Sequence, residues 1–203
     1  MRRERIPHLG GARAVVLHKP HPSLAVLTRQ LAAIGLQVTE CWPEPNADVL
    51  GADFLFFDVD LGFDAQFPWQ AGEAPMPTIA LIGSEAPGRI EWALSHRADA
   101  HLAKPLGQSG VYAALLIARQ GFEARRRLAR ELEDLRAQVA ERRVVVAAAL
   151  ILAGAGASES EAFGRLRALA MSWRVGVEEA ARRVCAARSA EVKGGEADGA
   201  ARR

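Results

Sequence analysis

The feature that most constrains this chain is a long stretch without proline, from Ser109 to about Ala153, whose interior only Gly121 interrupts. A stretch of this length predicts one continuous helix. Apolar residues recur along it at alternating steps of four and three if Arg142 is counted as one position of the series. These residues are Leu128, Leu132, Leu135, Val139 and Val146. This heptad spacing predicts a coiled-coil dimerisation helix over residues 119–143.

The alternative interpretation is an amphipathic helix that lies on its own domain. Most residues between the apolar positions are charged, as either interpretation requires. We favour the coiled-coil homodimer because little chain remains to cover so long a helix.

Residues 13–118 alternate between short apolar runs and helical patterns, which predicts a mainly parallel sheet covered on both sides. The runs that predict strands are 14–17, 36–41, 53–57, 78–82 and 100–103, and the helical patterns are 23–34, 87–96 and 109 onward. Five strands in about 110 residues fit an α/β fold of the flavodoxin-like type, with strand order 2-1-3-4-5. We expect an abbreviated helix between Leu61 and Pro77.

Polar residues follow the predicted strands at the edge where such folds place their ligands. This set resembles the receiver domains of response regulators. Asp58 matches their phosphate-accepting aspartate, and Lys104-Pro105 matches their Lys-Pro pair, whose proline is usually cis. However, His18 and Lys19 stand where receivers carry an acidic pair, and a cation there repels magnesium.

The switch hydroxyl of receivers also has no clear counterpart, because Ile82 occupies its position unless the register shifts to Ser84. Without metal or hydroxyl, transfer of a phosphoryl group to Asp58 loses its charge neutralisation. We therefore predict a pseudo-receiver in which Asp58 is a relic carboxylate. Its degenerate phosphoacceptor pocket comprises Asp58, Lys104, Pro105, His18 and Lys19.

Residues 144–188 predict a small bundle of three helices. The segment 154–157 breaks the long helix, and Ser158 with Glu161 forms a capping box for the next one. Gly176 separates that helix from the last. Residues 189–203 are polar and rich in Gly and Ala, which predicts a disordered tail.

Composition and motifs narrow the function classes. No apolar stretch reaches the roughly 18–20 residues that a membrane span needs. We find no P-loop, dinucleotide fingerprint or nucleophile elbow, and the pair His18 and His21 lacks further zinc ligands. The sequence therefore predicts a cytoplasmic protein that is not an enzyme and has no cofactor and no metal.

The charge is unevenly distributed. Residues 1–120 carry a net charge of −2 and residues 121–203 a net charge of +4. Contacts with a polyanion are therefore expected in the second part.

Two groups of motifs carry a second resemblance. Val144-x-x-Ala147, the run from Glu161 to Met171 and Ala180-Ala181-x-x-Val184 resemble the ANTAR domain, the RNA-binding module of bacterial antiterminators. The stretch from Gln30 to Pro45, with its Cys41-Trp42-Pro43, is similar to the amidase-operon branch of the AmiR/NasT-like transcription antiterminators. The resemblance covers roughly residues 13–188.

The resemblance implies a dimer that binds paired hairpins in leader mRNA and prevents formation of a terminator stem. It also implies control by a small-ligand-sensing repressor protein related to solute-binding proteins, with an amide as inducer. The RNA-binding residues that it implies are Arg143, Ala147, Phe163, Arg165, Arg167, Met171 and Arg174. Arg167 is the best single candidate because it follows a core leucine and should face outward.

The predicted bundle, residues 144–188, departs from the family in its first helix, where Ile151-Leu152 also replaces a Leu-Met pair. The family's Ala-Lys-Gly run is Ala147-Ala148-Ala149 here, so a basic residue expected near the RNA face is missing. Two alternatives stay open: a response regulator phosphorylated at Asp58, and a protein-interaction module that has lost RNA binding. Phe163 is equally compatible with RNA stacking and with a core position, and each arginine alone is compatible with a solvated surface charge.

Overall fold

The computed structural model describes residues 8–22, 24–45, 47–153 and 158–200. The chain divides into two compact units, Met1–Arg127 and Leu128–Arg203, and one long helix starts in the first and continues into the second. No described helix is long and apolar enough to cross a membrane.

The first unit is a five-stranded parallel sheet with the predicted order β2-β1-β3-β4-β5. Its strands are β1 (Arg13–Leu17), β2 (Gln37–Cys41), β3 (Phe54–Asp58), β4 (Thr78–Ile82) and β5 (Ala100–Ala103). Its helices are α1 (Leu24–Ile34), α2 (Pro87–Ser95) and the start of α3 (Val111–Ala153).

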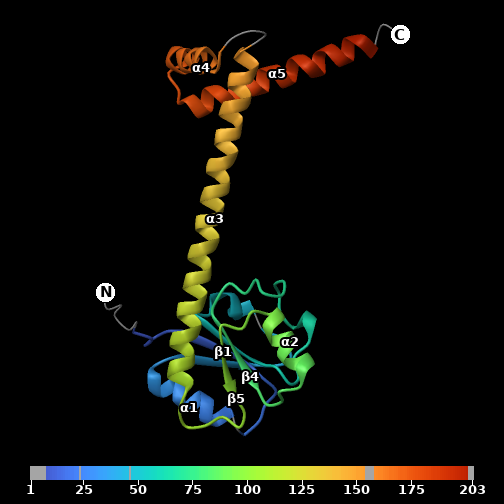
Figure 1. The fold of residues 1–203 in the computed structure, drawn as a ribbon. Coiled ribbons are helices and arrows are strands. Elements are labelled where there is room, and N and C mark those ends of the chain that lie inside the picture. Colours follow the sequence, from blue (N-terminus) through green and yellow to red (C-terminus); the bar gives the residue numbers. More distant parts are fainter. Residues whose placement is uncertain (1–7, 23, 46, 154–157, 201–203) are drawn as a thin grey trace. The chain divides into compact units, whose positions relative to one another are not determined.

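Two hydrophobic cores cover the two faces of this sheet, because successive side chains of a strand point to opposite faces. Phe54 and Phe56 of β3 pack in the core beneath α1 and the first turns of α3. Leu55 and Phe57 pack in the other core, with Ala93 of α2. All residues of β3 are buried, which explains why the strand reads as an unbroken apolar run. Figure 1 shows α1 and α3 on one side of the sheet and α2 on the other.

The segment from Leu61 to Pro77 contains less helix than a crossover usually has. Only Asp64–Gln66 forms a single 3-10 turn, labelled η2. Aromatic contacts fill the place of a longer helix, since Phe67 stacks on Trp69 and on Trp92 of α2. A second 3-10 turn, η1 (Ala47–Gly51), follows β2 and was not predicted.

The second unit contains the end of α3, α4 (Glu159–Trp173) and α5 (Val177–Ala200). Its core consists mainly of alanines from all three helices, packed around Leu166. Small side chains of this kind let helix backbones approach closely. The capping box at Ser158 and Glu161 is present as predicted.

Helix α3 runs without a break from Val111 to Ala153, as the proline-free stretch predicted, so the domain limits at residues 119 and 144 fall within one helix. One detail of the second unit differs from the sequence prediction. Helix α5 continues to Ala200, where a disordered tail was expected from residue 189. The first part of that tail contains Ala190, Glu191 and Lys193, and the high helix propensity of these residue types favours the extension. The predicted break at 154–157 lies outside the described residues.

Candidate functional site

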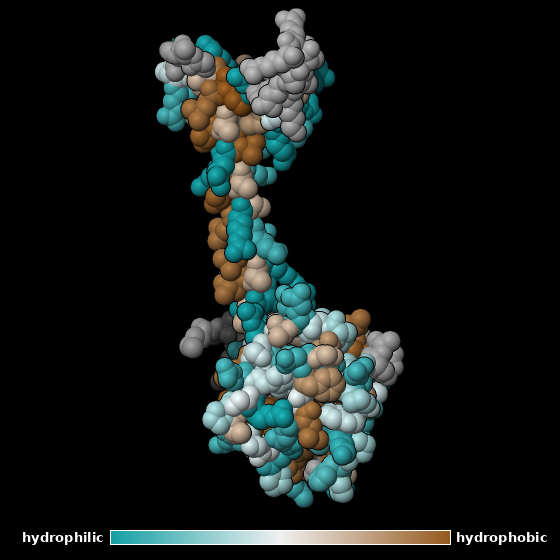
Figure 2. Space-filling view, turned by 90° about the vertical axis from the view of Figure 1, so that its right-hand side faces the viewer, coloured by the Kyte–Doolittle hydropathy of each residue, from teal (hydrophilic) through white to brown (hydrophobic). Residues whose placement is uncertain are grey.

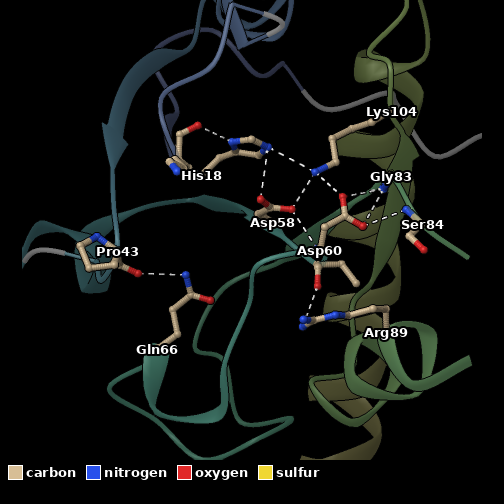
Figure 3. Close-up of polar contacts among 11 residues, drawn as sticks. His18, Pro43, Asp58, Asp60, Gln66, Gly83, Ser84, Arg89 and Lys104 are labelled. Atoms are coloured by element: carbon tan, nitrogen blue, oxygen red, sulfur yellow. Dashed lines mark hydrogen bonds and ion pairs between the residues drawn. The ribbon is translucent and has the colours of Figure 1, made fainter. Parts of the chain in front are cut away.

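The carboxyl ends of β1, β3 and β5 bring His18, Asp58 and Lys104 together, as the sequence predicted (Figure 3). The carboxylate of Asp58 is 1% exposed. Its Oδ1 accepts a hydrogen bond of 2.7 Å from Nζ of Lys104, and its Oδ2 lies 3.4 Å from Nε2 of His18. The would-be acceptor is thus buried between a cation and an imidazole ring.

The imidazole of His18 has a definable hydrogen-bonding role. Its Nδ1 lies 2.6 Å from the carbonyl oxygen of Lys19, which can only accept, so Nδ1 carries the hydrogen. In the neutral ring, Nε2 then accepts from Nζ of Lys104, 3.3 Å away. The side chain of Lys19 is exposed, so this residue contributes its backbone oxygen to the cluster.

Asp60 is the member of the cluster that the sequence analysis missed. Its Oδ2 lies 2.5 Å from Nζ of Lys104. The same carboxylate accepts hydrogen bonds from the backbone N–H groups of Gly83 and Ser84 after β4. The spacing Asp58-x-Asp60 at the end of a buried strand was the signal that could have revealed it.

The charges in the cluster reinforce one another. Burial opposes the charge of Lys104, but hydrogen bonds to Asp58 and Asp60 outweigh it and raise the lysine pKa above its ordinary 10.5. Burial likewise opposes the charge of Asp60, yet the bond from Lys104 and those from Ser84 and Gly83 lower its pKa below 3.8. Lys104 and Asp60 therefore both stay charged at neutral pH, and the cluster ties four strand ends together.

The structure also defines the other predicted features of this pocket. The bond between Lys104 and Pro105 is cis, as the receiver resemblance implied. Ile82 is the last residue of β4, paired with Ala103, so the register does not shift to Ser84. Among the described residues, no group of three or more His, Cys, Asp or Glu side chains is arranged to hold a metal ion.

The second candidate surface lies on α4, where helical spacing separates the predicted RNA-binding residues. Phe163, Arg167 and Met171 recur every four residues and so share one face, next to the buried stripe. Arg167 is exposed as predicted, Met171 is 80% exposed and Phe163 is partly buried. Arg174 ends the helix in a left-handed conformation with φ 53°.

Arg165 does not belong to that face. Its guanidinium Nη1 donates a hydrogen bond of 2.8 Å to the carbonyl oxygen of Leu152 at the end of α3. Arg143 and Ala147 are exposed on α3, one helical turn apart. The seven predicted residues therefore occupy more than one face of the bundle.

Ala148 requires a correction. The sequence placed it near the RNA face, as the position of a missing lysine, but the structure buries it completely. It belongs to the alanine-rich core with Leu166, Ala170 and Ala181. The absence of a lysine here therefore removes no charge from an exposed surface of the unit.

Comparisons with known proteins match this architecture. The family model described as "AmiR, N-terminal" matches residues 12–119, more than half of the chain. The chain belongs to the AmiR family. The model of the ANTAR domain matches residues 133–184, which fall on α3, α4 and α5.

A curated relative of this AmiR-family chain is the aliphatic amidase regulator of Pseudomonas aeruginosa. It is 28% identical over 164 residues, which cover 79% of this chain and 84% of the relative. The AmiR family membership of this chain and its match to the ANTAR domain make it an antitermination regulator of the amidase-regulator kind.

Solved structures also resemble the chain. A CheY-like response regulator from Mesorhizobium loti is 19% identical, with a TM-score of 0.39, and covers 54% of this chain and 98% of its own. A receiver domain of a diguanylate cyclase from Desulfovibrio desulfuricans is 15% identical, with a TM-score of 0.45, and covers 57% and 98% respectively.

Proposed function

We propose that this chain acts as a homodimer that binds hairpins in the leader of a nascent transcript and prevents termination. A ligand-sensing partner protein, and not phosphorylation, controls it. The observation that carries the proposal is the ANTAR match over residues 133–184, on a bundle whose helix α4 exposes Arg167 beside Phe163 and Met171. Cations beside an aromatic ring suit a single-stranded loop, which offers phosphates and unstacked bases.

The apolar seam of α3 supports the dimer. Its five residues are each between 46% and 59% exposed: Leu128, Leu132, Leu135, Val139 and Val146. Figure 2 shows apolar residues following one another along the middle of α3. Burial of one such side chain stabilises by roughly 1.5–3 kcal/mol, so a heptad stripe of five favours a second copy as its cover.

The cluster of His18, Asp58, Asp60 and Lys104 supports control by a partner protein. The Oδ1 atom of Asp58 is engaged by Lys104, and the carboxylate of Asp60 is engaged by Lys104 and two backbone N–H groups. His18 stands where receivers place a carboxylate for magnesium. These contacts favour a domain that serves as a docking module, and the family resemblance suggests a solute-binding-type protein that senses an amide.

A salt-series titration of the full chain against the leader RNA of its own operon tests this function. We expect tight binding that a scrambled hairpin does not reproduce and that weakens steeply as salt rises, because phosphate contacts release counterions. Binding no tighter than to the scrambled RNA would contradict the proposal and favour a regulator that acts through protein contacts alone.

The same preparation tests whether phosphorylation controls the protein. Beryllofluoride with magnesium mimics phosphorylation in competent receivers, and we expect no spectral change at Asp58. A saturable change that Asp58→Asn abolishes would instead favour the phosphorylated response regulator.

A further inference from the structure

A groove at one end of the helical bundle has no role in the function proposed above. It has a volume of about 750 Å³. Its lining comes from the last turn of α3, the end of α4 and the middle of α5: Leu150, Ile151, Leu152, Trp173, Arg183, Val184, Ala187 and Arg188. Leu150 is 70% exposed and Trp173 is 39% exposed, so large apolar groups border open space here.

We propose that this groove binds an unpaired RNA base, which stacks on the indole ring of Trp173, while Arg183 and Arg188 face the adjoining phosphates. The inference rests on the proposed RNA-binding function and adds a base-binding site to it.

The pair of Trp173 and Arg183 has the geometry of a stacking platform. The guanidinium carbon of Arg183 lies 5.8 Å from the centre of the indole ring, within the range of a cation–π contact. Glu179 holds this guanidinium in place, since its Oε1 accepts a hydrogen bond of 2.9 Å from Nε of Arg183. An ordered indole with a fixed cation beside it loses little freedom when a base stacks on it.

The charge of the lining favours RNA over a second copy of the chain. The lining of the groove includes two arginines and no carboxylate, and Glu179, which pairs with Arg183, lies outside the lining. A two-fold interface over this groove would gather the arginines of both copies in one buried patch, where like charges repel. Every nucleotide, by contrast, offers a base with a π-face for the ring and a phosphate for the cations.

The groove also continues a surface that the sequence had singled out. Arg143, Ala147 and Ile151 follow one another at steps of four along α3, so they share one side of that helix. Arg165 reaches the same end of the bundle through its bond to the carbonyl oxygen of Leu152. Ile151 lines the groove together with Trp173, so the side of α3 that carries Arg143 and Ala147 reaches the groove.

The test uses the full chain and a leader hairpin with 2-aminopurine at one unpaired loop position at a time. Stacking on an aromatic ring quenches the fluorescence of this base. We expect quenching at one position with the natural chain and with Trp173→Phe, and none with Trp173→Leu. We also expect Trp173→Leu to weaken binding about tenfold, as for one lost base stack, without changing the salt dependence.

The variant Arg188→Ala provides a matched comparison, because loss of a phosphate contact lowers the slope of log K against log salt. Circular dichroism melts of each variant show that the bundle still folds. Unchanged quenching and affinity in Trp173→Leu, with hairpin binding intact, would overturn the base site and leave the proposed function standing. No hairpin binding by the natural chain would overturn both. A change of oligomeric state in Trp173→Leu would show that the groove is an interface between copies.

Discussion

Nζ of Lys104 lies 2.7 Å from Oδ1 of Asp58 and 2.5 Å from Oδ2 of Asp60, so one ammonium group bridges two carboxylates of β3 and the residues after it. In a working receiver, the equivalent lysine contacts a phosphoryl group that enters from solvent. Here the side chain of Asp58 is 1% exposed and its cation is already in place. Lys104 therefore forms a structural clamp on the two carboxylates.

The first prediction concerns this clamp. We expect Lys104→Met to destabilise the first unit by about 3 kcal/mol, the lower end for a broken buried pair, because Asp58 is left without its cation. Urea unfolding monitored by tryptophan fluorescence measures the change. Lys19→Met, which removes an exposed cation nearby, is the control and should change the free energy of unfolding by less than about 0.5 kcal/mol. A double variant with Asp58→Asn should recover part of the loss; a loss as large as in the single variant would contradict the pairing.

The second prediction concerns pH. Burial among Phe67 and Trp92 lowers the pKa of His96 below 6.5, although Asp64 opposes this shift. The unfolded chain then binds more protons than the folded one as pH falls through 6.5, so the folded state loses stability there. The contribution of His96 is complete above pH 6.5 and disappears progressively at lower pH. Free energies of unfolding between pH 8 and pH 5 measure this, and His96→Phe should flatten the slope. An identical slope in both proteins would contradict the assignment.

The sheet could be predicted because its strands carry their own signature. Strands buried on both faces leave no polar alternation, and β3 and β4 show this plainly. The Leu61–Pro77 segment was harder, because packing of Phe67 and Trp69 with Trp92 replaces the helical periodicity that a sequence can display. Helix α5 was underestimated because a polar, alanine-rich composition is shared by exposed helices and disordered tails.

The candidate site also includes residues that the sequence predicted and residues that it did not. His18, Asp58 and Lys104 could be predicted because the topology of a parallel sheet brings the carboxyl ends of its strands together. The spacing Asp58-x-Asp60 pointed to Asp60, but its hydrogen bonds with the Gly83 and Ser84 amides depend on how the strands are arranged in space. Trp173 and Arg183 lie on two different helices, so only the tertiary structure reveals their contact.

The third prediction concerns the seam. We expect the natural chain to sediment as a dimer and the double variant Leu132→Glu/Leu135→Glu as a monomer, because it places like charges at the proposed interface. Ala137→Glu, an exposed position on the same helix away from the seam, adds one charge and should leave the dimer intact. Analytical ultracentrifugation at micromolar concentration distinguishes the two. A natural chain that is already monomeric there would refute the coiled-coil dimer.

The last prediction separates two neighbouring arginines of α4. Arg167 is exposed beside Phe163 and Met171, so Arg167→Ala should weaken leader binding and lower the slope of log K against log salt by about 0.7–0.9, the effect of one phosphate contact. Arg165 is engaged with the carbonyl of Leu152, so Arg165→Ala should instead cost about 1 kcal/mol of stability in the bundle, with a smaller effect on the slope. Salt titrations and thermal melts of both variants decide the matter. Equal slopes would mean that α4 does not present Arg167 to RNA in the orientation that its helical face implies.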